Sequence, residues 1–174
     1  RWMGDGPAVW KTPVAERADT GTAGQEPLSA GGNHHGALAE TPDQKKRYGV
    51  KQGDGTVNAI RLVDRTGTQT ITTGANPVWA VARSGSARIY ALNSGSGTVS
   101  AIDTVTDSVV GSASVGAGAN YVVYDGSLNR LYVTHPVANT VTGVTVATHP
   151  PAVVFTRPVA GAPTDAALPP SAPR

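Results

Sequence analysis

The chain has 174 residues, with 14 Lys and Arg against 12 Asp and Glu, and no cysteine. The length suits one domain or part of a larger protein. The absence of cysteine excludes disulfide frameworks, thiolate zinc sites, iron–sulfur clusters and cysteine nucleophiles. A formal net charge of +2 is too small for a nucleic-acid surface or a polybasic membrane surface. No apolar run approaches the roughly 20 residues of a membrane-spanning helix, and no signal peptide is visible.

The composition favours β-structure. The chain holds 22 Val but only 7 Leu and 1 Phe, and it has 21 Gly and 13 Pro. Residues branched at Cβ fit a pleated strand, whereas a sequence poor in Leu and rich in Gly offers few places for a helix. We therefore predict an all-β protein with a thin core.

An internal repeat of 42 residues organises the chain. Tyr48, Tyr90 and Tyr132 are 42 residues apart, and a Lys or Arg stands two residues before each. Sliding residues 55–96 onto 97–138 without a gap gives 11 identities in 42 positions, where chance would give roughly 4. The matches share one offset, which indicates a true repeat.

Each unit is predicted to contain four short strands separated by Gly, Asp and Ser turns. The pattern is clearest in the second unit, where strands are expected over 78–82, 88–92, 98–103 and 109–115. In chain order, we predict an irregular arm or outer strands of a preceding unit over 1–31, three units over 32–73, 74–115 and 116–157, and the start of a truncated unit over 158–174. In the first unit, residues 32–39 take the innermost strand.

Four strands in about 40–45 residues is the spacing of a β-propeller blade. The predicted fold is thus a partial β-propeller of four-stranded antiparallel blades. Propellers typically close with about 4–8 blades, so the chain is expected to be a fragment, to oligomerise or to form an open arc. A small ring closed by residues 1–31 is the remaining alternative.

Three stretches carry a resemblance to a known family. Tyr132-Val133-Thr134-His135 is one substitution from the Tyr-Val-Thr-Asn signature of the YVTN-type β-propeller repeat family. The segments Gly97–Asp107 and Gly74–Val81 resemble the parts of that repeat after and before the signature. The resemblance runs from about Gly32 to the end of the chain. It implies a propeller fold and kinship with exported surface-layer and secreted repeat proteins.

Histidines are the candidate ligand-binding residues. In a propeller, the start of the innermost strand and the end of the next strand lie on one face, so His34 and His35 are expected to share a face with His135, while His149 lies on the opposite one. Three imidazoles on one rim can ligate copper or haem iron, and nitrous oxide reductase and haem d1 nitrite reductase use such rim histidines. The alternative is an exposed histidine pair in a turn.

Other polar residues have simpler explanations. Lys45-Lys46-Arg47, the one cationic cluster, is expected to face solvent at a hairpin, with an anionic partner as the alternative. Asp103 and Asp107 are interpreted as turn formers. Gly116–Ala119 resembles half a nucleotide loop but precedes no helix.

Three functions therefore stay open. The first is a non-catalytic scaffold or binding module, exported by resemblance, with a protein or cell-surface ligand as partner and no cofactor. The second is the propeller of an oxidoreductase that holds copper or haem through rim histidines. The third is a lactonase-like hydrolase, because sugar-lactone hydrolases share this propeller style. No catalytic motif is visible, which favours a protein that is not an enzyme. Self-association is expected if the ring is incomplete.

Overall fold

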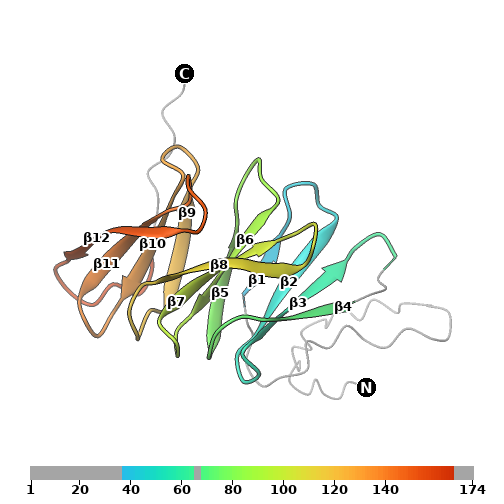
Figure 1. The fold of residues 1–174 in the computed structure, drawn as a ribbon. Coiled ribbons are helices and arrows are strands. Elements are labelled where there is room, and N and C mark those ends of the chain that lie inside the picture. The colour runs from blue at the N-terminus through green and yellow to red at the C-terminus, as the bar shows by residue number, and fades with distance from the viewer. Residues whose placement is uncertain (1–36, 65–67, 167–174) are drawn as a thin grey trace, which may run out of the picture.

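The structure, a computed structural model, describes residues 37–64 and 68–166. These residues form three four-stranded antiparallel sheets and contain no helix (Figure 1). The predicted all-β fold of four-stranded units is confirmed. The first sheet contains β1 (Leu38–Glu40), β2 (Lys46–Lys51), β3 (Thr56–Arg61) and β4 (Thr68–Thr72). The second contains β5 (Pro77–Ala82), β6 (Arg88–Asn93), β7 (Thr98–Asp103) and β8 (Ser108–Ser114), and the third β9 (Tyr121–Asp125), β10 (Arg130–His135), β11 (Thr140–Thr145) and β12 (Ala152–Pro158).

The sequence repeat is also a repeat of strand register. Each periodic tyrosine faces the same position of the following strand, in the pairs Tyr48–Ala59, Tyr90–Ala101 and Tyr132–Gly143. The hairpin after each tyrosine strand turns through one left-handed residue, with φ of 66° at Gly55, 62° at Gly97 and 51° at Asn139. Gly and Asn are the residues that adopt this conformation at least cost. The turns therefore fix the same register in all three sheets.

The three sheets stack face to face in a fan (Figure 1). The innermost strands β1, β5 and β9 contact one another in succession, and so do the outermost strands β4, β8 and β12. We call the contact of the first and second sheets the first seam, and that of the second and third sheets the second seam. Each seam closes over its own cluster of buried apolar side chains, because a four-stranded sheet cannot bury both faces alone.

Two of the three periodic tyrosines are buried between sheets. Tyr48 is buried in the first seam and Tyr90 in the second. The second seam also has a polar contact, in which Arg83 of the second sheet donates to the Val146 carbonyl oxygen at 2.9 Å and to Asn129 Oδ1 at 3.0 Å. The seams thus combine an apolar centre with specific hydrogen bonds.

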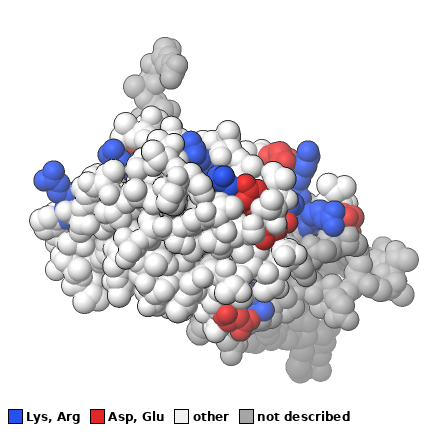
Figure 2. Space-filling model, in the orientation of Figure 1, with Lys and Arg blue, Asp and Glu red and all other residues white. Residues whose placement is uncertain are grey.

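The two ends of the fan differ in chemistry. One end, which we call the charged rim, holds the turns that join the first to the second and the third to the fourth strand of each sheet. The other end, the His135 rim, holds the turns between the second and third strands and the links between sheets. Lys, Arg, Asp and Glu gather along the upper edge of the face seen in Figure 2, while the area below them is largely uncharged. Among the described residues, no helix is long and apolar enough to cross a membrane.

Candidate functional site

Of the three histidines predicted to share a rim, only His135 lies among the described residues, so their gathering on one face stays a prediction. His135 ends β10 at the His135 rim, and only 4% of it is exposed. His34 and His35 lie outside the described residues. His149 lies beyond the opposite end of β11, where its Nε2 is 2.9 Å from the Val110 carbonyl oxygen of β8. Within residues 37–64 and 68–166, no three His, Asp or Glu side chains gather as metal ligands.

The imidazole of His135 is buried. Its Nε2 is buried without a hydrogen-bond partner. An added Cβ on Gly116, in the link between the second and third sheets, would lie 3.9 Å from His135 Cε1. Burial lowers the pKa of His135 below its ordinary value, although a hydrogen bond to the Ala117 backbone opposes this shift. The ring is therefore neutral at pH 7.

Acidification is expected to destabilise the chain through His135. Because its pKa is lowered from 6.5 in the folded state, the unfolded chain binds more protons as the pH falls below that value. Stability is then level above pH 6.5 and falls below it, by at most about 1.4 kcal/mol per pH unit for one proton. His135→Asn removes this part of the slope in urea titrations at pH 5 to 8, whereas exposed His149→Asn retains it. Identical slopes in the wild type and His135→Asn would contradict the assignment.

The repeat explains why a polar residue stands at position 135. Lys51, Asn93 and His135 are 42 residues apart, and each ends the second strand of its sheet. Asn93 is fully buried and donates through Nδ2 to Thr98 Oγ1 at 3.0 Å and to Ser100 Oγ at 2.9 Å. The position thus braces the hairpin in the second sheet. This equivalence was available from the sequence, and it places His135 at the position that Asn93 occupies in the second sheet.

A groove opens at the charged rim, over the first seam. It encloses about 400 Å³ between the Thr41–Lys46 turn of the first sheet and two turns of the second sheet. Its walls mix apolar side chains with ions, since Pro42, Ala87 and Val105 lie beside Asp43 and Lys45. Val105 is 77% exposed. The groove therefore offers both apolar and charged contacts to a bound molecule.

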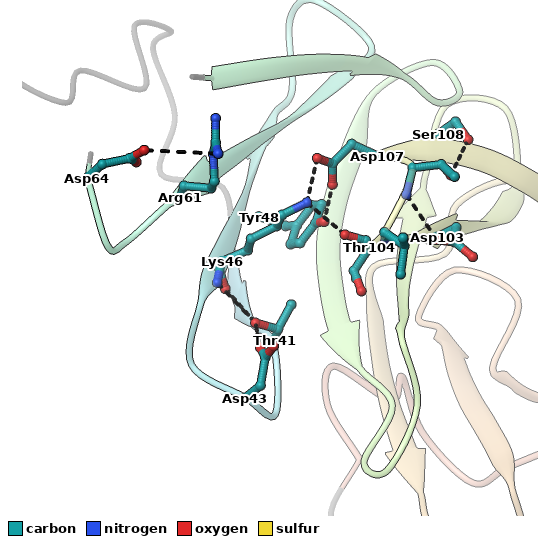
Figure 3. A network of polar contacts seen from close by, with 12 residues as sticks. Thr41, Asp43, Lys46, Tyr48, Arg61, Asp64, Asp103, Thr104, Asp107 and Ser108 are labelled. Carbon is teal, nitrogen blue, oxygen red and sulfur yellow. Dashed lines mark hydrogen bonds and ion pairs between the residues drawn. The ribbon is translucent and has the colours of Figure 1, made fainter. Parts of the chain in front are cut away.

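A polar network fixes one side of this groove (Figure 3). Lys46 of β2 reaches across the first seam, where its Nζ lies 2.6 Å from Asp107 Oδ2 and donates to the Thr104 carbonyl oxygen at 2.7 Å. The Tyr48 hydroxyl donates to the other carboxylate oxygen of Asp107. Burial, followed by the bond to Asp107 and the charge of that carboxylate, raises the pKa of Tyr48. Tyr48 therefore stays a neutral donor.

The turns on either side of the groove are held by their own carboxylates. Asp103 accepts from the backbone N–H groups of Val105 and Thr106 and pairs with Arg88. Burial opposes ionisation of Asp103, but these donors outweigh it and lower the pKa. Asp43 accepts from the Thr41 hydroxyl at 2.6 Å, which lowers its pKa. Both acids are thus ionised, and each stabilises its own turn.

The sequence predicted the cationic cluster Lys45-Lys46-Arg47, but it did not predict which of these side chains pair with carboxylates. The prediction that Lys45-Lys46-Arg47 faces solvent holds for Lys45, whose side chain is 71% exposed. It is wrong for Lys46, whose side chain is 20% exposed and pairs with Asp107. Asp107 is a turn former as predicted, with φ of 50°, but it is also the carboxylate that joins two sheets.

Comparisons with known proteins identify the fold. No family model matches the chain, and no curated protein matches it in sequence. Hydrazine synthase of Kuenenia stuttgartiensis superposes with a TM-score of 0.68 at 14% identity, over 82% of this chain and 42% of that one. Apo AztD from Citrobacter koseri gives 0.62 at 16% identity, over 74% and 36%. A 6-phosphogluconolactonase candidate from Bacteroides uniformis gives 0.57 at 14% identity, over 74% and 45%.

These neighbours are β-propeller proteins, and the three sheets correspond to propeller blades. The chain spans less than half the length of each of these structures. At such low identity the likeness is one of fold alone. The neighbours carry different functions by name, so none of those functions follows for this chain.

Proposed function

We propose that the chain forms three blades of an exported, YVTN-type β-propeller that acts as a non-catalytic binding or scaffold module. The single observation that carries the proposal is the groove over the first seam, which lies beside the Lys46–Tyr48–Asp107 network. The network holds the two blades together where the groove divides them. The groove walls are thus preorganised, which lowers the entropic cost of binding.

The chemistry of the groove favours recognition of a protein segment. Exposed Val105 and Pro42 offer apolar contact, while Lys45 and Asp43 provide one charge of each sign within 3.8 Å of each other. Bond-making chemistry usually requires a site that excludes water, and this groove is open to solvent along the rim. A protein or cell-surface ligand with an apolar side chain flanked by charges fits these walls.

Site-directed photo-crosslinking tests the proposal. A benzophenone side chain at position 105 is expected to crosslink one partner from cell-envelope material, whereas the same group at Val137, which is 93% exposed outside the groove, does not. With the partner purified, Val105→Asp should weaken binding at least about tenfold, which corresponds to about 1.4 kcal/mol. Val137→Asp should leave binding unchanged.

Four results would contradict this function. Equal crosslinking from positions 105 and 137, or equal binding by Val105→Asp and Val137→Asp, would show that the groove is not the contact. Stoichiometric copper or haem that is lost in the His34→Ala/His35→Ala variant would favour an oxidoreductase instead. Turnover across a panel of sugar lactones would favour a hydrolase. Export is tested separately, by locating the native protein in fractionated source cells.

A further inference from the structure

The third sheet has one face that no other sheet of the described chain covers. At the equivalent positions of the first two sheets, Tyr48 and Tyr90 are 0% and 3% exposed, because the next sheet packs on them. Tyr132 occupies the same register but is only partly buried. Val123, Val141 and Phe155 are likewise partly exposed. Register places these side chains with Tyr132 on one surface, which we call the open face.

The open face carries a cation and a phenol in the arrangement that binds a carboxylate at the first seam. There, Lys46 and Tyr48 both donate to Asp107 of the following sheet. Arg130 and Tyr132 stand 84 positions later in the repeat, at the same places on β10. The Arg130 guanidinium lies 5.6 Å from the centre of the Phe155 ring. Its Nε is buried and has no hydrogen-bond partner.

The backbone makes the same hydrogen bond after the outermost strand of all three sheets. In the first and second sheets, the residue after the outermost strand donates to the left-handed residue of the middle hairpin, from Thr73 to Gly55 at 3.0 Å and from Val115 to Gly97 at 2.8 Å. Val159 donates to Asn139 in the same way at 2.8 Å. Each earlier link of this kind leads to another four-stranded sheet.

We propose that the open face docks a further blade of the same ring, and that a carboxylate in the turn between the third and fourth strands of that blade binds Arg130 and Tyr132. The proposal rests on the proposed propeller architecture. Continuity with the two seams identifies the occupant as a four-stranded sheet. Arg130 Nε has no hydrogen-bond partner, and Lys46 at the equivalent position of the first sheet pairs with Asp107. Both observations indicate that the docked sheet contributes a carboxylate.

A chimera of the chain with its own second blade tests the proposal. Residues after Ala162 are replaced by a copy of residues 77–115, which supplies a fourth sheet with a copy of Asp107. We expect the urea midpoint to rise in the chimera. Tyr132→Phe, or Asn at the copied Asp107, should lower the folding equilibrium constant of the chimera about tenfold, and the double variant should lose no more than either single one. In the unextended chain, Tyr132→Phe should have little effect.

Equal effects of Tyr132→Phe in the chimera and the unextended chain would overturn the proposal, because a merely structural tyrosine behaves that way. If the chimera does not fold, the rate of amide hydrogen exchange in β10 of the unextended chain shows whether the open face is covered. Protection equal to that of β6 would mean that the open face is already closed, and exchange faster than in β6 supports a vacant docking surface. A dimer in sedimentation that Tyr132→Arg dissociates would assign the face to a second copy and overturn the proposal. Crosslinking at position 105 is independent of all these outcomes.

Discussion

Replacing Asp107 with asparagine is expected to lower the free energy of unfolding by about 2 kcal/mol. The substitution keeps the left-handed turn, because Asn adopts positive φ readily, and it removes only the charge and one acceptor. Lys46 Nζ and the Tyr48 hydroxyl bind different oxygens of the Asp107 carboxylate, and in asparagine one of these two atoms becomes an NH2 group, which cannot accept a hydrogen bond. The Lys46 and Asp107 side chains are only 20% and 19% exposed, so water replaces the lost bonds poorly. Urea denaturation at pH 7 measures the loss.

Asp54→Asn is the matched control. The Lys51–Asp54 pair has an N–O distance of 2.7 Å, almost that of Lys46–Asp107, but the Asp54 side chain is 57% exposed and lies on the same sheet as its partner. An exposed pair of this kind contributes at most about 1 kcal/mol. Equal losses in Asp107→Asn and Asp54→Asn would mean that the first seam does not depend on its ion pair.

Gly97→Ala is expected to cost about 3 kcal/mol of folding free energy. Gly97 has φ of 62°, and an added Cβ would lie 2.6 Å from the Gly116 carbonyl carbon and from the Ala117 nitrogen. Both atoms belong to the backbone of the link between the second and third sheets, so no side chain can rotate away. The methyl group must therefore open the second seam or distort the hairpin. Thermal and urea unfolding both report the change.

Gly85→Ala is the control that separates the cost of the steric clash in Gly97→Ala from the cost of placing alanine at a positive φ. Gly85 has a φ of 68°, close to that of Gly97, but no heavy atom lies within 4 Å of an added Cβ. Only the cost of a left-handed alanine remains, about 1 kcal/mol. The difference between the two variants measures the contact between the hairpin and the link. If both variants lose the same stability, the Gly97 turn is not held against Gly116.

The strands and turns were predictable because their causes are local. In the second sheet, the expected strand over 98–103 and β7 coincide, since alternation of polar and apolar residues and a flanking Gly97 define both ends. The repeat extended this pattern to units with weaker signals. Residues 32–36 of the predicted first strand lie outside the described residues, and β1 begins at Leu38.

The site was less predictable because its contacts join residues distant in sequence. Lys46 and Asp107 are separated by 61 positions, and their meeting depends on the twist and spacing of two sheets. The same positions of the second seam behave differently, since Arg88 pairs with Asp103 inside its own sheet. A repeat in sequence predicts which residues are equivalent, but side-chain length and neighbouring charge decide whom each one contacts. The burial of His135 follows from the same packing.

The unlike polar contacts at the two seams make the repeats non-interchangeable. The first seam is joined by Lys46, Tyr48 and Asp107. The second seam is joined by Arg83, which donates to Asn129 and to the Val146 carbonyl oxygen. A chain that misfolded by skipping or exchanging a unit would match the apolar surfaces but leave a guanidinium or a carboxylate without its counterpart. Near-identical modules in tandem are prone to such mispairing. Divergence at these few positions therefore favours the pairing of each sheet with its own neighbour.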